Sequence, residues 1–145
     1  MADKKLFFED VKVGEEIPPL VKKPTNVQLF MFSAATWNRA RIHYDSDYAR
    51  NNEGLPDILV HRPLQGSFLA QLLTDWMGEE GSLKKFSWSV RISSVPGDTL
   101  TCRGKVIGKH LKDKEHLVEC ELWIENQRGE KVTFGKATLA LPSRG

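Results

Sequence analysis

Cysteine is scarce in this chain, since Cys102 and Cys120 are the only two among 145 residues. They lie far apart, no neighbouring cysteine or histidine has the spacing of a zinc site, and Cys120 sits among alternating apolar residues. We therefore interpret both as reduced side chains that pack in a core. At this length one domain, residues 1–145, can bury a core without disulfide support.

Long apolar runs are also missing. Residues 1–10 carry positive charge without the apolar stretch of a signal peptide, and no later segment could span a bilayer. The formal net charge of +2 is dispersed, with no basic block or stripe, which disfavours a nucleic-acid partner. We expect a cytoplasmic protein.

Helical periodicity is present in the first half of the chain. Thr25-Asn26 is suited to cap a helix that ends near Thr36. Apolar residues recur at helical spacing within it: Val27, Phe30, Met31 and Ala34. A longer helix is predicted over 63–77, because Pro63 pre-sets its first turn and Gly78 ends it. Its wide apolar face is formed by Leu64, Phe68, Leu69, Leu72, Leu73 and Trp76.

After Gly81 the apolar period changes from helical to two, which predicts β-strands. The strands are expected near 17–23, over 86–92, from Leu100 onward, over 116–125 and over 131–141. Such an antiparallel sheet has one face to bury, and the helix over 63–77 is the long apolar helix available to cover it. The fold class is therefore α+β.

Two polar segments carry the candidate chemistry. The run from Asn38 to Asp45 contains Arg41 and His43, and the long helix begins after Val60-His61-Arg62. Imidazole titrates near neutral pH, so a histidine there can exchange a proton with a substrate. The simpler interpretation of His43 is a hydrogen-bonded loop histidine. His61 at a helix start is better suited to a structural role, capping the helix or bonding nearby backbone, than to donating a proton.

The ordered set of motifs resembles the MaoC-like dehydratases, the (R)-specific enoyl-CoA hydratase family. The resemblance rests on Phe8-Glu9-Asp10-Val11-Lys12-Val13-Gly14-Glu15, His43-Tyr44-Asp45, Val60-His61, Pro96-Gly97-Asp98-Thr99-Leu100 and Asn126-Gln127-Arg128-Gly129-Glu130, and it covers almost the whole chain. It implies a hot-dog fold, in which an antiparallel sheet wraps the helix over 63–77. It also implies a homodimer, or a heterodimer with a related hot-dog subunit.

The family's catalytic pair is an aspartate followed by a histidine five residues later. His43 matches the histidine, but Asn38 stands at the aspartate position, and an amide cannot take up a proton at neutral pH. In one interpretation His43 carries both proton transfers and Asn38 orients the water. A branch resembling mesaconyl-CoA-type hydratases shares this asparagine. In the other interpretation, the site is weakened and the chain is a noncatalytic or half-competent subunit.

The resemblance also assigns the electrophilic group. In the family a backbone N–H at the start of the long helix stabilises the thioester oxygen, and here that donor is Arg62. The Arg62 side chain adds bulk and charge, which favours a short or carboxylated acyl group. Further substrate contacts are assigned to four residues: Asp45, Arg41, His61 and Gly66. The simpler interpretation of Arg41 is an ordinary surface arginine, and Asp45 either orients His43 or ends a local turn.

We therefore predict an enoyl-CoA hydratase or 3-hydroxyacyl thioester dehydratase that adds water to a trans-2-enoyl thioester and eliminates it again. CoA enters as part of the substrate, an acyl-carrier thioester being the alternative, and no metal or tightly bound cofactor is expected. A noncatalytic subunit of a heteromeric dehydratase is the main alternative. A hot-dog thioesterase is disfavoured, since Asp75 and Glu79 lie at the far end of the long helix. Trp37 is predicted to pack against the protein.

Overall fold

The structure is a computed structural model that describes residues 5–145. Residues 1–4 lie outside that range, and so does that part of the segment for which the sequence predicted no signal peptide. The elements in chain order are η1 (Phe8–Asp10), β1 (Glu16–Lys22), α1 (Asn26–Thr36), η2 (Arg41–His43), α2 (Ser46–Asn51), α3 (Arg62–Met77), β2 (Ser82–Val90), β3 (Leu100–Lys112), β4 (Glu115–Glu125) and β5 (Lys131–Leu141).

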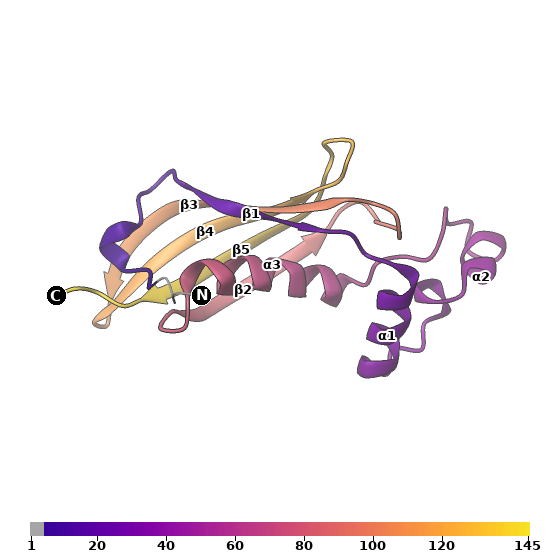
Figure 1. The fold of residues 1–145 in the computed structure, drawn as a ribbon, viewed down its shortest axis with the longest axis horizontal. Helices are drawn as coiled ribbons and strands as arrows, with labels where there is room; N and C mark the ends of the chain where they lie inside the picture. The colour runs from indigo at the N-terminus through magenta and orange to yellow at the C-terminus, as the bar shows by residue number, and fades with distance from the viewer. Residues whose placement is uncertain (1–4) are drawn as a thin grey trace.

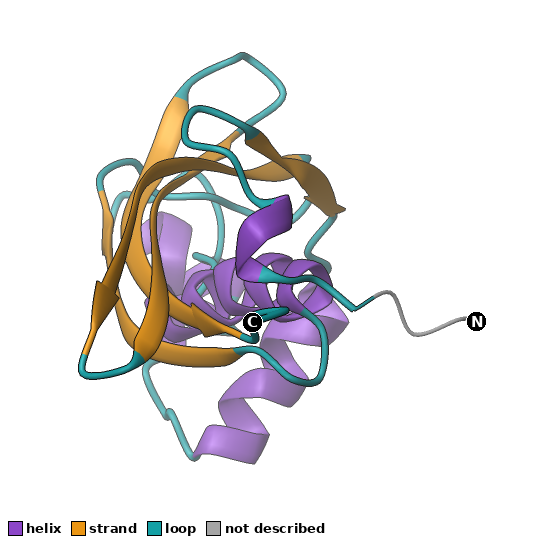
Figure 2. Ribbon diagram, turned by 90° about the vertical axis from the view of Figure 1, so that its left-hand side faces the viewer, coloured by secondary structure: helices purple, strands orange, loops and turns teal. Residues whose placement is uncertain are grey.

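The strands form one antiparallel sheet of five, in the order β1-β3-β4-β5-β2. The sheet curves around α3, which lies along its concave side (Figures 1 and 2). This is the hot-dog fold, so the predicted fold class is confirmed. The predicted bounds of α3 and β5 agree with the structure to within one residue. The long-range order of the strands was not predicted, because alternation in one strand does not specify its neighbour.

Helix α3 supplies the centre of the core. Its residues Leu69, Leu72 and Leu73 are at most 2% exposed, and they pack against the inward side chains of the sheet. Burial of each such leucine contributes about 1.5–3 kcal/mol relative to full exposure. Cys102 and Cys120 belong to the same core and are free, as predicted, and burial raises the pKa of each thiol to about 12.

The edge strand β2 is fastened to the start of α3 through Trp88. Its indole Nε1 donates to the carbonyl oxygen of Arg62 at 3.0 Å. A Cβ atom built on Gly66 would lie 2.5 Å from the same indole ring. Glycine at 66 therefore lets the tryptophan lie against the helix.

Helix α1 begins as predicted, with the side chain of Thr25 accepting from the backbone N–H of Gln28. Its apolar stripe, however, is turned to solvent: Val27, Phe30 and Met31 are 66%, 61% and 63% exposed. The helix buries Leu29 and Ser33 instead. It lies to one side of the sheet, next to the start of α3, rather than on the sheet face (Figure 1).

Two local predictions were wrong or missing. Trp37 does not pack, because it ends α1 in the left-handed conformation and is 75% exposed. Helix α2 was not predicted at all. Asp45 is its N-cap, accepting from the backbone N–H of Tyr48 at 3.1 Å, and the six-residue helix is too short to display a clear periodicity.

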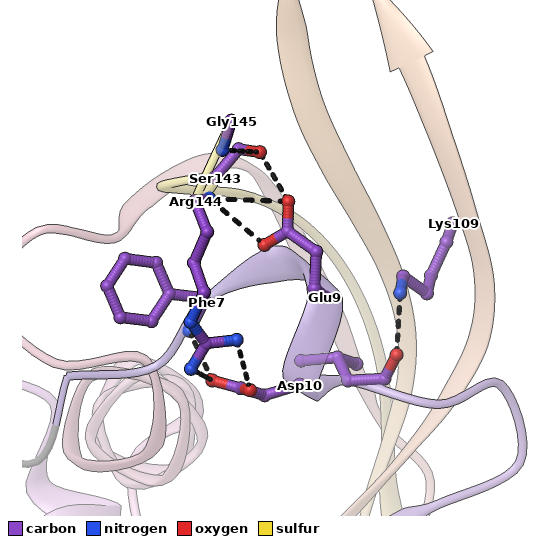
Figure 3. Close-up of polar contacts among 8 residues, drawn as sticks. Phe7, Glu9, Asp10, Lys109, Ser143, Arg144 and Gly145 are labelled. Carbon is purple, nitrogen blue, oxygen red and sulfur yellow. Dashed lines mark hydrogen bonds and ion pairs between the residues drawn. The ribbon is translucent and has the colours of Figure 1, made fainter.

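The chain ends are fastened to each other at the opposite end of the molecule from α1. Arg144 forms a forked ion pair with Asp10 at 2.6 and 3.1 Å, and Glu9 accepts from the backbone N–H of Arg144 and from Ser143 (Figure 3). Lys109 donates to the carbonyl oxygen of Val11 at 2.6 Å. Within residues 5–145, none of the helices has both the length and the apolar character needed to cross a membrane.

Candidate active site

His43 is held by a backbone contact. It ends the short helix η2, and its Nδ1 atom lies 2.7 Å from the carbonyl oxygen of Leu59. A carbonyl oxygen only accepts, so Nδ1 carries the proton and the neutral ring presents Nε2 as a bare acceptor. No other side chain or backbone group of residues 5–145 bonds Nε2. The backbone N–H of Leu59 donates in turn to the carbonyl oxygen of Ile42, so the segments around His43 and Leu59 are held together by two bonds.

His61 lies against His43 at the start of α3. The two rings are stacked, with centroids 4.0 Å apart and planes inclined by 19°. His61 is fully buried, and its Nε2 atom is 2.7 Å from the hydroxyl of Ser33 on α1. Burial and, to a lesser extent, the neighbouring His43 lower the pKa of His61 to about 4. His61 is therefore neutral at pH 7.

The structure thus brings His43 to the amino end of α3, as the sequence predicted. His61 is the N-cap residue of α3, and its side chain makes no bond to the first turn. Among the described residues, none accepts from the backbone N–H of Arg62. The side chain of Arg62 is exposed. This end of α3 carries the positive pole of a 16-residue helix.

Asn38 follows α1 and is half-buried. Its backbone N–H donates to the carbonyl oxygen of Ser33 at 2.9 Å, which ties it to the residue that bonds His61. Its Oδ1 atom accepts from the backbone N–H of Ala40 at 3.2 Å. Within the described chain, the two N–H donors of Nδ2 are left for a further partner.

Three of the predicted substrate contacts are engaged elsewhere. Arg41 donates to Asp45 from Nε and Nη2 at 3.2 and 2.8 Å, and this bond is the main cause that lowers the pKa of the Asp45 carboxyl. Asp45 does not orient His43, because the Nδ1 atom of His43 is bonded to Leu59. The open side of Gly66 is filled by the indole of Trp88. The geometry gives these residues structural roles.

Sequence reasoning missed the buried polar residues around His61. Ser33 is 6% exposed, while Gln65 and Ser94 are fully buried. The sequence did offer one signal for Ser33 and Gln65. Ser33 is a polar residue in an apolar helix, and Gln65 is a polar residue that interrupts the apolar face of α3. Ser94 reaches the site only through the fold, since its carbonyl oxygen accepts from Val60.

A cavity of about 510 Å³ lies elsewhere. It is lined by the last turns of α3, including Leu72 and Trp76, and by the start of β1. Leu72 is ten residues from Arg62, which corresponds to about 15 Å along the helix axis. This cavity is therefore separate from the histidine pair, which lies where α1, η2 and the start of α3 meet.

The sequence profile of the hydroxyacyl-thioester dehydratase type 2 family matches residues 12–95, more than half of the chain. The chain belongs to this family. The matched range includes the whole candidate site, from Ser33 to Ser94. The predicted membership among the MaoC-like dehydratases is thereby confirmed.

The chain is also similar to one curated protein over a short segment and to solved structures over most of its length. A mesaconyl-C(4)-CoA hydratase of Chloroflexus aurantiacus is 52% identical over 44 residues, which are 30% of this chain and only 16% of that protein. A solved structure of a putative MaoC domain protein dehydratase from Chloroflexus aurantiacus aligns with a TM-score of 0.88 at 19% identity, covering 99% of this chain and 42% of that one.

One chain of the solved complex of ChsH1 and ChsH2 from Mycobacterium tuberculosis aligns with a TM-score of 0.78 at 22% identity. The alignment covers 90% of this chain and 98% of that chain. At such identities, both solved structures show the fold alone.

Proposed function

We propose that this chain is a hydratase or dehydratase that interconverts a trans-2-enoyl thioester and a 3-hydroxyacyl thioester, with CoA as the carrier. The observation that carries the proposal is the fixed tautomer of His43, whose bare Nε2 faces no protein partner in residues 5–145. Membership of the hydroxyacyl-thioester dehydratase family supports the reaction class. The reaction needs no tightly bound cofactor.

The proposed hydration has two proton transfers, both made by Nε2 of His43. Nε2 removes a proton from a water molecule as the water oxygen bonds to the β-carbon, and the electrons of the double bond move onto the thioester oxygen. The resulting imidazolium then delivers its proton to the α-carbon while the thioester carbonyl re-forms. The net change is the addition of one water, and dehydration is the reverse.

Asn38 holds the attacking water in this proposal. Because Oδ1 of Asn38 is bonded to Ala40, the amide acts through Nδ2, which donates to the water oxygen. A water held in that way directs its own proton toward an acceptor such as Nε2 of His43. The backbone link from Asn38 to Ser33, and the bond from Ser33 to His61, keep the amide near the histidine pair.

The backbone N–H of Arg62 is the proposed donor to the thioester oxygen, on which negative charge develops. The uncapped start of α3 favours an anion there. His61 is neutral at pH 7, so it packs against His43 without adding a charge that would compete for the proton.

A short, carboxylated acyl group is the substrate that we favour. The guanidinium of Arg62 is exposed beside the site and can pair with a carboxylate. The 44-residue match to a mesaconyl-C(4)-CoA hydratase supports the same class, although it covers a small part of that protein. The free cysteines fit the reducing cytoplasm, which we propose as the location.

Assembly with a second copy of this chain is a further part of the proposal. The outer edge of β2 is unpaired in the described sheet, and α1 exposes Val27, Phe30 and Met31. A long unpaired edge and an apolar stripe both favour a partner.

Sedimentation tests this assembly. Wild type should be a dimer at micromolar concentration, and Phe30→Glu should shift it toward monomer, whereas Leu111→Glu, 64% exposed on β3, should not. A monomeric wild type that gains activity only with a related subunit would replace the homodimer by a heterodimer.

The catalytic proposal is tested with crotonyl-CoA and the purified chain. Wild type should consume the conjugated enoyl absorbance without releasing free thiol. His43→Gln should lower turnover by at least about 10²-fold, the usual contribution of a general acid–base group, with an unchanged circular dichroism spectrum. His110→Gln, at an exposed position on β3, is the matched control and should be fully active.

Other outcomes identify the alternatives. Release of free CoA would indicate a thioesterase, which the distance of Asp75 and Glu79 from the histidine pair disfavours. Neither reaction, even in the assembled protein, would indicate a noncatalytic subunit. Full activity of His43→Gln would refute the role assigned to His43.

A further inference from the structure

Buried polar atoms without partners gather at the start of α3. Among residues 5–145 three such side-chain atoms occur: Nδ1 of His61, Nε2 of Gln65 and Oγ of Ser94. They belong to one region, because the backbone N–H of Gln65 donates to His61 and the backbone N–H of Val60 donates to Ser94. A buried donor without an acceptor is unfavourable, and a bound water or a substrate oxygen would satisfy it.

The amide of Gln65 is held in one orientation. The side chain is fully buried, and its Oε1 atom accepts from the hydroxyl of Thr133 on β5. The two donors of Nε2 remain, fixed in direction and shielded from solvent. A rigid donor in a dry environment is the arrangement that stabilises developing negative charge, since no reorientation is needed when the charge forms.

The first turn of α3 is short of donors. Pro63 has no N–H, and the N–H of Gln65 is already bonded to His61. Gln65 lies in the first turn of α3, three residues after Arg62, and side chains of a helix lean toward its amino end. The first turn thus holds two unpartnered donors among the described residues, the backbone N–H of Arg62 and the Nε2 of Gln65.

We infer that Nε2 of Gln65 is a second donor to the thioester oxygen and completes, with the N–H of Arg62, the oxyanion hole of this site. The inference rests on the proposed function and deepens it. The acceptor is the oxygen that becomes an enolate when water adds to the β-carbon. Thr133 is a positioning residue, because it acts on the substrate only through Gln65.

The test replaces the amide by an apolar side chain of similar length. Gln65→Leu should lower kcat for crotonyl-CoA about 10²–10³-fold, the usual effect of removing one oxyanion donor, with KM changed only a few-fold. Gln71→Leu, at an exposed position on the same helix, should leave both constants unchanged. Gln65→Met is a second variant in case leucine does not fold.

A spectroscopic measurement separates donation from packing. In the His43→Gln background, which should bind without turnover, a bound 2,4-dienoyl-CoA should absorb at longer wavelength because the donors polarise its carbonyl group. Adding Gln65→Leu should shrink that shift, and Thr133→Val should shrink it by a smaller amount. Thermal unfolding of each variant reports whether the fold is retained.

Several results would overturn the inference. If wild type hydrates crotonyl-CoA and Gln65→Leu keeps its kcat and its spectral shift, Gln65 only binds a buried water, and the proposed function stands. A loss confined to carboxylated substrates would make the amide a contact to the acyl tail. Unfolding of both Gln65 variants would make it structural. A wild type that is inactive even in the assembled protein would refute the proposed function and this inference together.

Discussion

Acidification from pH 7 to pH 5 should destabilise the fold through His61. Burial, and to a lesser extent His43, lower the pKa of His61 in the folded protein to about 4, whereas an exposed histidine titrates near 6.5. Between these two values the unfolded chain binds a proton that the folded chain does not. The free energy of unfolding therefore rises with pH in this window, and the stability is lost as the pH falls from about 6.5 toward 4.

The magnitude follows from the two pKa values. At pH 5 an exposed histidine is almost fully protonated and His61 almost fully neutral, which corresponds to about 2 kcal/mol relative to pH 7. This value is large enough to measure, because small domains have only about 5–15 kcal/mol of stability in total.

The assay is urea unfolding of wild type and His61→Gln at pH 7, 6 and 5. The glutamine variant should be less stable at pH 7, because it loses the stacking on His43, but its stability should depend less on pH by about 1–2 kcal/mol over this range. Comparing slopes removes the contribution of carboxylates, which both proteins share. Identical slopes in the two proteins would refute the assignment of a buried, neutral His61.

Two further predictions concern Gly66 and Asn38. Gly66→Ala should lower the free energy of unfolding, measured with denaturant, by about 1–3 kcal/mol in spite of alanine's better helix propensity. The reason is that the new Cβ would displace the Trp88 indole and its bond to Arg62. Gly108→Ala is the control and should be far milder, because its Cβ would meet Glu119 at 3.7 Å. Asn38→Asp should leave kcat for crotonyl-CoA within a few-fold of wild type, since His43 carries both proton transfers, and a gain above about tenfold would indicate a decayed aspartate site.

Much of the local structure could be predicted from sequence. Helix α3 follows from Pro63, Gly78 and a wide apolar face, and β5 from an alternating run that ends before Pro142. The same patterns could not say what the stripe of α1 faces, because periodicity reports that a helix has an apolar side and not which surface covers it. Helix α2 escaped prediction since one turn of helix depends on its cap, Asp45, more than on its pattern.

The candidate site divides in the same way. The sequence alone predicted His43 as the proton carrier, because it follows Asn38 by five residues as in the MaoC-like pattern, and it predicted that the long helix begins next to Arg62. Only the tertiary structure decided the partners: Leu59 fixes the tautomer of His43, and Ser33 holds His61 from another helix. It also showed that Gln65 is buried with a free donor. Hydrogen-bond partners far apart along the chain depend on how the sheet and helices pack, and local sequence patterns do not record that packing.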